Sequence, residues 1–169
     1  MGYVKEQGVK ANMFVPVYNG NGQKVLSCLA LDASTAKYFG QVQPTSSGFG
    51  FLSIAGVAST MYKFGVALEG GASGKYIDVA IAGYVPGVNI GGTGNTTAHS
   101  TFVKGDAVVL TDTGHLFAFG ATWHLQYSDV CSTVQSSGGG CVGVAMSSGE
   151  TTSVDLLIIE KPYIFPGTS

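Results

Sequence analysis

The chain has 169 residues, eight of them basic and ten acidic, and a formal net charge of −2. Hydrophobic residues make up 45% of the sequence, which is enough for a packed core and excludes an intrinsically disordered polar chain. No run approaches the roughly 18 apolar residues of a membrane-spanning helix, and arginine, which nucleic-acid binders use for phosphate contacts, does not occur. We therefore expect neither a membrane nor a nucleic acid as a partner.

The low charge of the chain points to a component of an assembly. Charged residues are 11% of the sequence, against about 25% in an average globular protein, and 26 residues are glycine. Much of the exterior must therefore consist of Ser, Thr, Gly and apolar side chains, and such a surface is expected to contact other protein. The alternative is a monomer that hydroxyl and amide groups keep soluble.

The first predicted elements are a hairpin and a short helix. Residues 14–18 and 24–31 form two strands around Asn-Gly-Asn-Gly, because Asn-Gly adopts the positive φ values of tight turns. Residues 32–40 are the one candidate helix, of two turns, with Asp32 as N-cap and Gly40 after its end.

Alternating apolar residues predict the remaining strands. Ile, Val and Ile at positions 77, 79 and 81 indicate a strand with one buried face. Residues 103–110 and 116–119 flank an Asp-Thr-Gly turn and form a second hairpin. In residues 154–159 both faces are apolar except for Asp155, so this strand contacts water only at its start.

An internal repeat is the most informative feature of the sequence. Gly-Val-Ala-Leu at 65–68 recurs as Gly-Val-Ala-Met at 143–146, and each is followed by a turn and an alternating strand, at 76–82 and 153–159. The offset is 78 residues before the turn and 77 after it. The simplest account is a duplicated β unit.

The repeat suggests the organisation of the whole chain. Upstream of the Gly-Val-Ala segments, residues 24–32 lie 80 positions before residues 104–112, which extends the match. We predict an all-β protein with an N-terminal arm and a β domain made of two similar halves joined by a polar linker. The boundaries are 1–12 for the arm, 13–169 for the domain, about 13–86 and 101–166 for the halves, and 87–100 for the linker.

The sequence Gly-Asp-Ala-Val-Val-Leu at 105–110, together with the two Gly-Val-Ala segments and the strand after each, resembles small head decoration, or capsid cement, proteins of tailed bacteriophages. The resemblance implies a compact β-barrel or tulip-like sandwich built from the duplicated hairpin unit, with extended N- and C-terminal arms. It also implies a homotrimer on the outer capsid surface that stabilises contacts between major capsid proteins. The expected location is the virion, after synthesis in the host cytoplasm, since the N-terminus has no apolar signal-peptide region.

Apolar residues near both ends are the candidate contacts to the capsid or to a second subunit. Lys-Pro-Tyr-Ile-Phe-Pro at 161–166 holds three large apolar side chains in a stiff extended segment. These side chains either dock on a neighbouring subunit or close the barrel of their own chain, and the N-terminal arm has the same two interpretations. The candidates are Tyr3, Val4, Met13, Phe14, Tyr163, Ile164 and Phe165.

A second hypothesis is a head-fibre or tail-associated β module that recognises glycan on the host surface. It rests on Phe119, Trp123 and Tyr127, which could stack on sugar rings if their loop is exposed. The position of these aromatic side chains distinguishes the two hypotheses, because an outward-facing cluster favours recognition and buried aromatic residues favour the cement function.

Motifs for chemistry are weak in this sequence. No Gly-x-Ser-x-Gly elbow, P-loop or Cys-x-x-Cys spacing occurs, so we predict no enzyme, no cofactor and no metal. Cys131 and Cys141 flank a flexible Ser-Ser-Gly-Gly-Gly stretch at 136–140, and this spacing permits a disulfide. The alternative is a pair of small buried or unreactive thiols.

Overall fold

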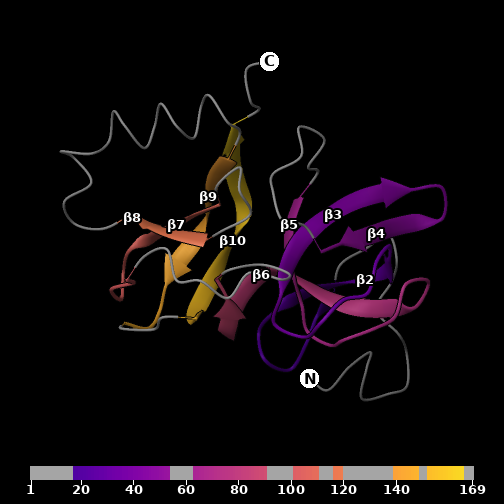
Figure 1. Ribbon diagram of the computed structural model, residues 1–169, viewed down its shortest axis with the longest axis horizontal. Helices are drawn as coiled ribbons and strands as arrows, with labels where there is room; N and C mark the ends of the chain where they lie inside the picture. The colour runs from indigo at the N-terminus through magenta and orange to yellow at the C-terminus, as the bar shows by residue number, and fades with distance from the viewer. Residues whose placement is uncertain are drawn as a thin grey trace.

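The computed structural model describes residues 17–53, 63–90, 101–110, 116–119, 139–148 and 152–165. Within these ranges every regular element is a β-strand (Figure 1). The strands are hydrogen-bonded in the order β1-β2-β4-β3-β5-β6-β10-β9-β7-β8. They are β1 (Val17–Tyr18), β2 (Lys24–Ala30), β3 (Phe39–Thr45), β4 (Gly48–Leu52), β5 (Lys63–Ala67), β6 (Tyr76–Asn89), β7 (Ala107–Leu110), β8 (Leu116–Phe119), β9 (Gly139–Ala145) and β10 (Ser153–Phe165).

Five of these strands close into a barrel. β2, β4, β3, β5 and β6 are neighbours in that order, and β6 also pairs with β2, which completes the ring. β2 and β4 run parallel, and the other pairs are antiparallel. One cluster of buried side chains draws on all five strands and includes Cys28, Val42, Phe51, Ala67 and Val79, each at 0% exposure. The predicted all-β barrel class is therefore confirmed.

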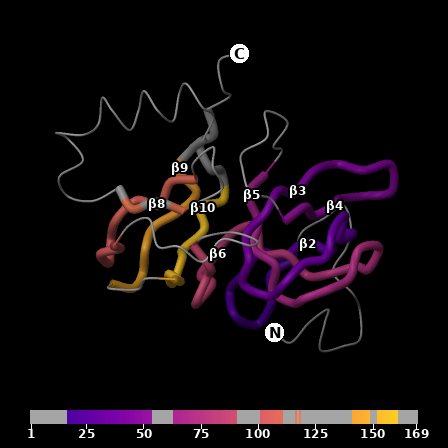
Figure 2. Tube along the Cα trace, in the orientation of Figure 1, coloured from indigo at the N-terminus to yellow at the C-terminus, as the bar shows by residue number. Residues whose placement is uncertain are grey.

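β6 continues beyond the barrel into a second, antiparallel sheet with the order β6, β10, β9, β7, β8. In Figure 2 the strands β2 to β4 lie to the right and β8 to β10 to the left, with β6 between them. The N–H of Leu116 in β8 donates a hydrogen bond of 2.9 Å to the carbonyl of Ile90, directly after β6. The last strand of the second sheet is thus hydrogen-bonded to the residue that follows β6.

Gly83 is the point where β6 passes from the barrel to the second sheet. Ala82 still pairs with Lys24 of β2, whereas Gly83 pairs with Ile158 of β10. The φ of Gly83 is +97°, and a Cβ at this position would lie 2.7 Å from the carbonyl oxygen of Gly22 in the β1–β2 turn. Only glycine permits both this φ and this close approach. The passage of β6 from one sheet to the other therefore depends on a glycine at position 83.

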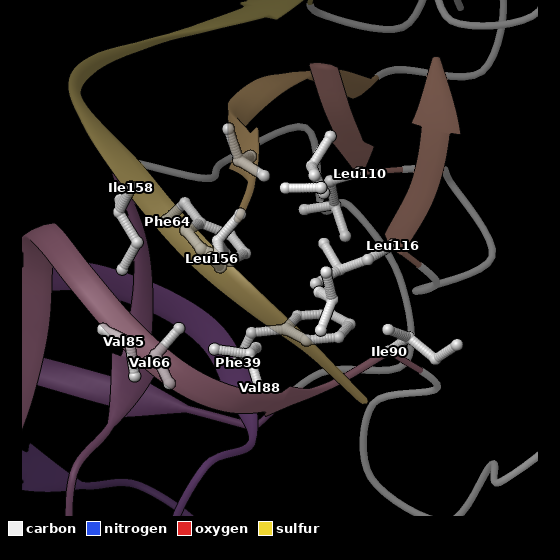
Figure 3. Close-up of a cluster of buried hydrophobic side chains, with 14 of the residues drawn as sticks. Phe39, Phe64, Val66, Val85, Val88, Ile90, Leu110, Leu116, Leu156 and Ile158 are labelled. Atoms are coloured by element: carbon white, nitrogen blue, oxygen red, sulfur yellow. The ribbon is translucent and has the colours of Figure 1, made fainter. Parts of the chain in front are cut away.

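The outer face of the barrel and the inner face of the second sheet share one core (Figure 3). Phe39 of β3 and Phe64 of β5 stack with ring centroids 5.8 Å apart, and both are fully buried. They belong to the same cluster as Val85 and Val88 of β6 and Leu156 of β10. Each large apolar side chain buried here contributes about 1.5–3 kcal/mol, so the two sheets stabilise each other.

The internal repeat recurs in the strand register of the two sheets. β5 pairs with β6, and β9 pairs with β10, with the same residues of the repeat opposite each other. The hydrogen bond after each Gly-Val-Ala segment is also repeated, from Leu68 N–H to the Asp78 carbonyl (2.9 Å) and from Met146 N–H to the Asp155 carbonyl (2.7 Å). The cross-strand pair Val66–Ala80 in the barrel corresponds to the pair Val144–Leu157 in the second sheet. The pair Ala67–Val79 corresponds in the same way to Ala145–Leu156.

The upstream part of the repeat differs from the alignment that the sequence suggested. That alignment matched residues 24–32 with residues 104–112, but β7 pairs with β9 as β3 pairs with β5. Lys37 before β3 and Gly105 before β7 each have a positive φ, and each donates its N–H to the alanine carbonyl of its Gly-Val-Ala segment at 2.8 Å. β3 is therefore the counterpart of β7, and the end of β6 beside β10 takes the place that β2 has in the barrel.

The predicted helix at 32–40 is wrong. Asp32 does not cap a helix; its Oδ1 accepts a hydrogen bond of 3.0 Å from the N–H of Ser53, at the end of β4. Lys37 has a φ of +70°, which is incompatible with a right-handed helix, and β3 begins at Phe39. The bonds to neighbouring strands outweigh the weak local helix preference of this segment.

The boundary of the predicted linker also changes. β6 runs to Asn89, so residues 87–89 belong to a strand, and Val88 and Ile90 are buried in the shared core. The sequence missed this extension because Gly87 interrupts the alternation of apolar residues, and Gly87 coincides with a register shift between β6 and β10. Residues 91–100 lie outside the described part of the chain.

The C-terminal segment is part of β10. The backbones of Tyr163, Ile164 and Phe165 pair with Cys141, Gly140 and Gly139 of β9. Pro162 falls in the register shift between Ile158 and Tyr163, where no ladder hydrogen bond from its nitrogen is needed.

Replacement of Gly83 by alanine tests the role of this residue. We expect Gly83→Ala to lower the free energy of unfolding by about 2–4 kcal/mol, because the new Cβ meets the Gly22 carbonyl and the backbone is strained. Gly87→Ala is the matched control, since Gly87 also has a positive φ (+66°) but no atom within 4 Å of its Cβ position, and about 1 kcal/mol is expected. Urea unfolding measures both, and equal losses would contradict the proposed close approach.

Candidate functional site

A row of apolar side chains crosses the outer face of the second sheet. Tyr84 of β6 lies opposite Leu157 of β10, Leu157 lies opposite Val144 of β9, and Val144 lies opposite Ala107 of β7. Tyr84 is 42% exposed and Leu157 37%, while Val144 and Ala107 are partly exposed. We call these four residues the outer row. Apolar side chains that are open to solvent on adjacent strands are typical of a contact surface.

The polar groups beside the outer row are already hydrogen-bonded. The hydroxyl of Tyr84 donates to Oδ2 of Asp155 at 3.0 Å, and the N–H of Gly87 donates to Oδ1 at 2.8 Å. The Asp155 N–H donates to Oγ of Ser147 at 2.9 Å. The hydrogen bond to the Asp155 carboxylate raises the pKa of Tyr84 above its ordinary value. If another protein covers this region, both carboxylate oxygens of Asp155 therefore keep their hydrogen-bond donors.

A second group of polar contacts joins the barrel to the second sheet around Glu160 of β10. Lys24 of β2 forms an ion pair with the Glu160 carboxylate, and the ammonium of Lys63 in β5 donates to the Glu160 carbonyl at 2.9 Å. The hydrogen bond to Glu160 raises the pKa of Lys24, whereas burial lowers the pKa of Lys63. Lys24 also lies 5.9 Å from the ring centroid of Tyr18. These contacts connect the edges of the two sheets and add to the shared core.

The two described cysteines, Cys28 and Cys141, form no disulfide with each other. Cys28 is fully buried inside the barrel, and burial, with the charge of Asp78 as a second cause, raises its thiol pKa to about 12. Cys141 of β9 is partly exposed, and burial raises its pKa as well, while a backbone hydrogen bond at Gly143 acts in the opposite direction. Cys131 lies outside the described residues, so its pairing with Cys141 stays a prediction.

The structure describes few of the residues that the sequence proposed as sites. Tyr3, Val4, Met13, Phe14, Trp123 and Tyr127 lie outside the described residues. Phe119 is placed in β8, where its backbone pairs with Ala107, and Tyr163, Ile164 and Phe165 are placed in β10. The contacts of these four side chains stay predictions, as does the glycan-binding surface.

Sequence reasoning missed the outer row. One signal was present, because Leu157 and Ile159 lie on the face of β10 opposite to Leu156, and a strand that is apolar on both faces needs cover on both. Tyr84 gave no such signal, since the bend at Gly83 determines which face it lies on.

Groups that could carry chemistry are not clustered in the described part of the chain. There, no three His, Cys, Asp or Glu side chains lie close enough together to hold a metal ion. The described segments also contain no helix that is long and apolar enough to cross a membrane. Comparison with protein families, with curated proteins and with solved structures finds no significant match for the chain.

The reactivity of the thiols should follow their pKa. At pH 8 a thiol with a pKa of about 12 is ionised to roughly 0.01%, so we expect iodoacetamide to leave Cys28 unmodified in the folded protein and to modify it after unfolding in urea. Cys141 should react in the folded protein, but more slowly than free cysteine, because its pKa is also raised. Mass spectrometry of the tryptic peptides measures both, and rapid modification of native Cys28 would contradict the closed barrel.

Proposed function

We propose that the chain is a structural virion protein, a head decoration or cement protein that binds the outside of a tailed-phage capsid as a homotrimer. It stabilises contacts between major capsid proteins and carries out no catalysis. The observation that carries the proposal is the duplicated β unit of low charge, in which two sheets with the same strand register are fused through β6 and one shared core.

The physical requirements of a cement protein support this proposal. Such a protein adds buried apolar area between shell subunits, and it needs a scaffold that does not deform under load. The barrel and the second sheet share their core, so neither can move without exposing residues such as Phe39 and Leu156. Only 11% of the residues in the chain are charged, so few charges must lose water when the protein contacts another protein.

The proposed contacts to the shell are the apolar residues of the two ends. Each such side chain contributes about 1.5–3 kcal/mol when it is buried in a neighbour. At the C-terminal end the backbone pairing of β10 with β9 holds residues 163–165 in an extended strand. An ordered segment loses less conformational entropy on binding than a mobile one, which favours tight attachment. The proposed contact residues are Tyr3, Val4, Met13, Phe14, Tyr163, Ile164 and Phe165.

Co-sedimentation with capsids tests the proposal. Capsids of the phage that encodes the chain, assembled without it, should bind the purified protein at a fixed number of copies. Phe165→Ser should weaken binding by roughly 10- to 100-fold, which corresponds to the loss of one buried aromatic contact. Tyr18→Ser is the control, because Tyr18 is 57% exposed on the barrel and has no proposed contact to the shell.

Two results would contradict the proposed function. Wild-type protein that fails to bind capsids would overturn it, and binding to host-surface glycan without capsid binding would support the recognition module instead. Equal binding of Phe165→Ser and wild type would overturn the C-terminal contact alone.

Capsid stability gives an independent test. We expect capsids that carry the protein to withstand heating several degrees above the temperature at which bare capsids release their DNA, because the added contacts must break first. DNA release can be followed with an intercalating dye. Equal release temperatures at full occupancy would contradict stabilisation.

A further inference from the structure

The outer row has a counterpart in the barrel. The repeat relates Leu157 to Ala80 and Val144 to Val66, and the matched strands relate Ala107 to Phe39 and Tyr84 to Val25. The counterparts are also directly opposite one another across β2, β6, β5 and β3. We call them the inner row, which consists of Val25, Ala80, Val66 and Phe39.

The inner row is buried because the second sheet covers it. Phe39, Val66 and Ala80 have 0% exposure and belong to the shared core with Val85 and Val88. Figure 3 shows Phe39 beside Val88, and Val66 beside Val85. The N–H of Asn89 donates to the Lys37 carbonyl at 2.9 Å and holds the end of β6 next to the start of β3. This face of the repeat unit is thus a sheet-packing face.

Among the described residues, the same face of the second unit is partly exposed. Tyr84 and Leu157 are 42% and 37% exposed, where the corresponding Val25 and Ala80 are 3% and 0% exposed. Within the described part of the chain, one of the two register-matched rows is therefore covered and the other is partly exposed.

We infer that the outer row is the surface through which copies of this chain dock on one another. The inference deepens the proposed function and rests on its homotrimer, for which it names the contact. Three copies around an axis can each present Leu157 and Tyr84 to the others, so that one apolar cluster forms at the centre.

Charge favours a second copy as the occupant. Asp155 is a charged side chain beside the outer row, and both of its carboxylate oxygens already accept hydrogen bonds. Two identical surfaces of strong charge would repel each other, whereas the four residues of the outer row carry no charge. A row of apolar side chains is also complementary to itself, which a cyclic assembly of identical chains can use.

Light scattering behind a sizing column tests the inference on the full chain. Wild type should elute near three times the chain mass of 17.3 kDa, and Leu157→Asp should elute near 17.3 kDa, because the substitution places a carboxylate in the contact. Val103→Asp is the matched control, since Val103 is 58% exposed, lies outside the outer row and gains the same charge. It should assemble as wild type does, and circular dichroism should confirm that all three proteins are folded.

A milder variant covers the case in which Leu157→Asp does not fold. Leu157→Thr adds no charge and introduces a β-branched side chain that suits a strand, and it should raise the dissociation constant of the assembly roughly 10- to 100-fold. An unchanged dissociation constant for this variant would overturn the inference.

The outcomes separate the inference from the proposed function. If wild type and Leu157→Asp both assemble, the inference is wrong and the homotrimer stands. If wild type is a monomer at every concentration, the inference and the homotrimer are both wrong, while co-sedimentation still decides whether the chain binds capsids.

Discussion

The structure depends on one strand that two sheets share. β6 closes the barrel with residues 76–82 and pairs with β10 through residues 83–89, and Gly83 makes the passage possible through a φ that other residues avoid. The passage brings Val85 and Val88 over Phe39 and joins the two sheets in a single core. The Lys24–Glu160 ion pair and the Lys63 contact add to this junction, but such partly exposed contacts contribute little compared with the buried side chains.

The duplication explains why the two units differ in their exposure. Both units have the same strand register, and both have an apolar row on one face. In the first unit that row lies under the second unit, whereas in the described part of the second unit it is partly exposed. A chain that repeats one packing face and covers it once is suited to an assembly, since further copies or a shell can cover the second face. This connects the fold with the proposed capsid function.

Much of the fold could be predicted from local patterns, and the errors have a common physical cause. Alternation at 77, 79 and 81 and the recurring Gly-Val-Ala segments led to the correct strands, because burial of one face acts within a few residues. The helix at 32–40 and the match of 24–32 with 104–112 were wrong, since Lys37 and Asp32 bond to distant strands. The outer row was not found because the faces of β6 depend on the bend at Gly83.

Electron cryomicroscopy of capsids with and without the protein tests the central claim most directly. The account predicts added density on the outside of the shell, with threefold symmetry, into which two-sheet units of this shape fit and which touches neighbouring major capsid proteins. Shells that are identical in the two samples, at protein concentrations that saturate any specific site, would contradict the account. Density confined to the tail or to a fibre would contradict it as well.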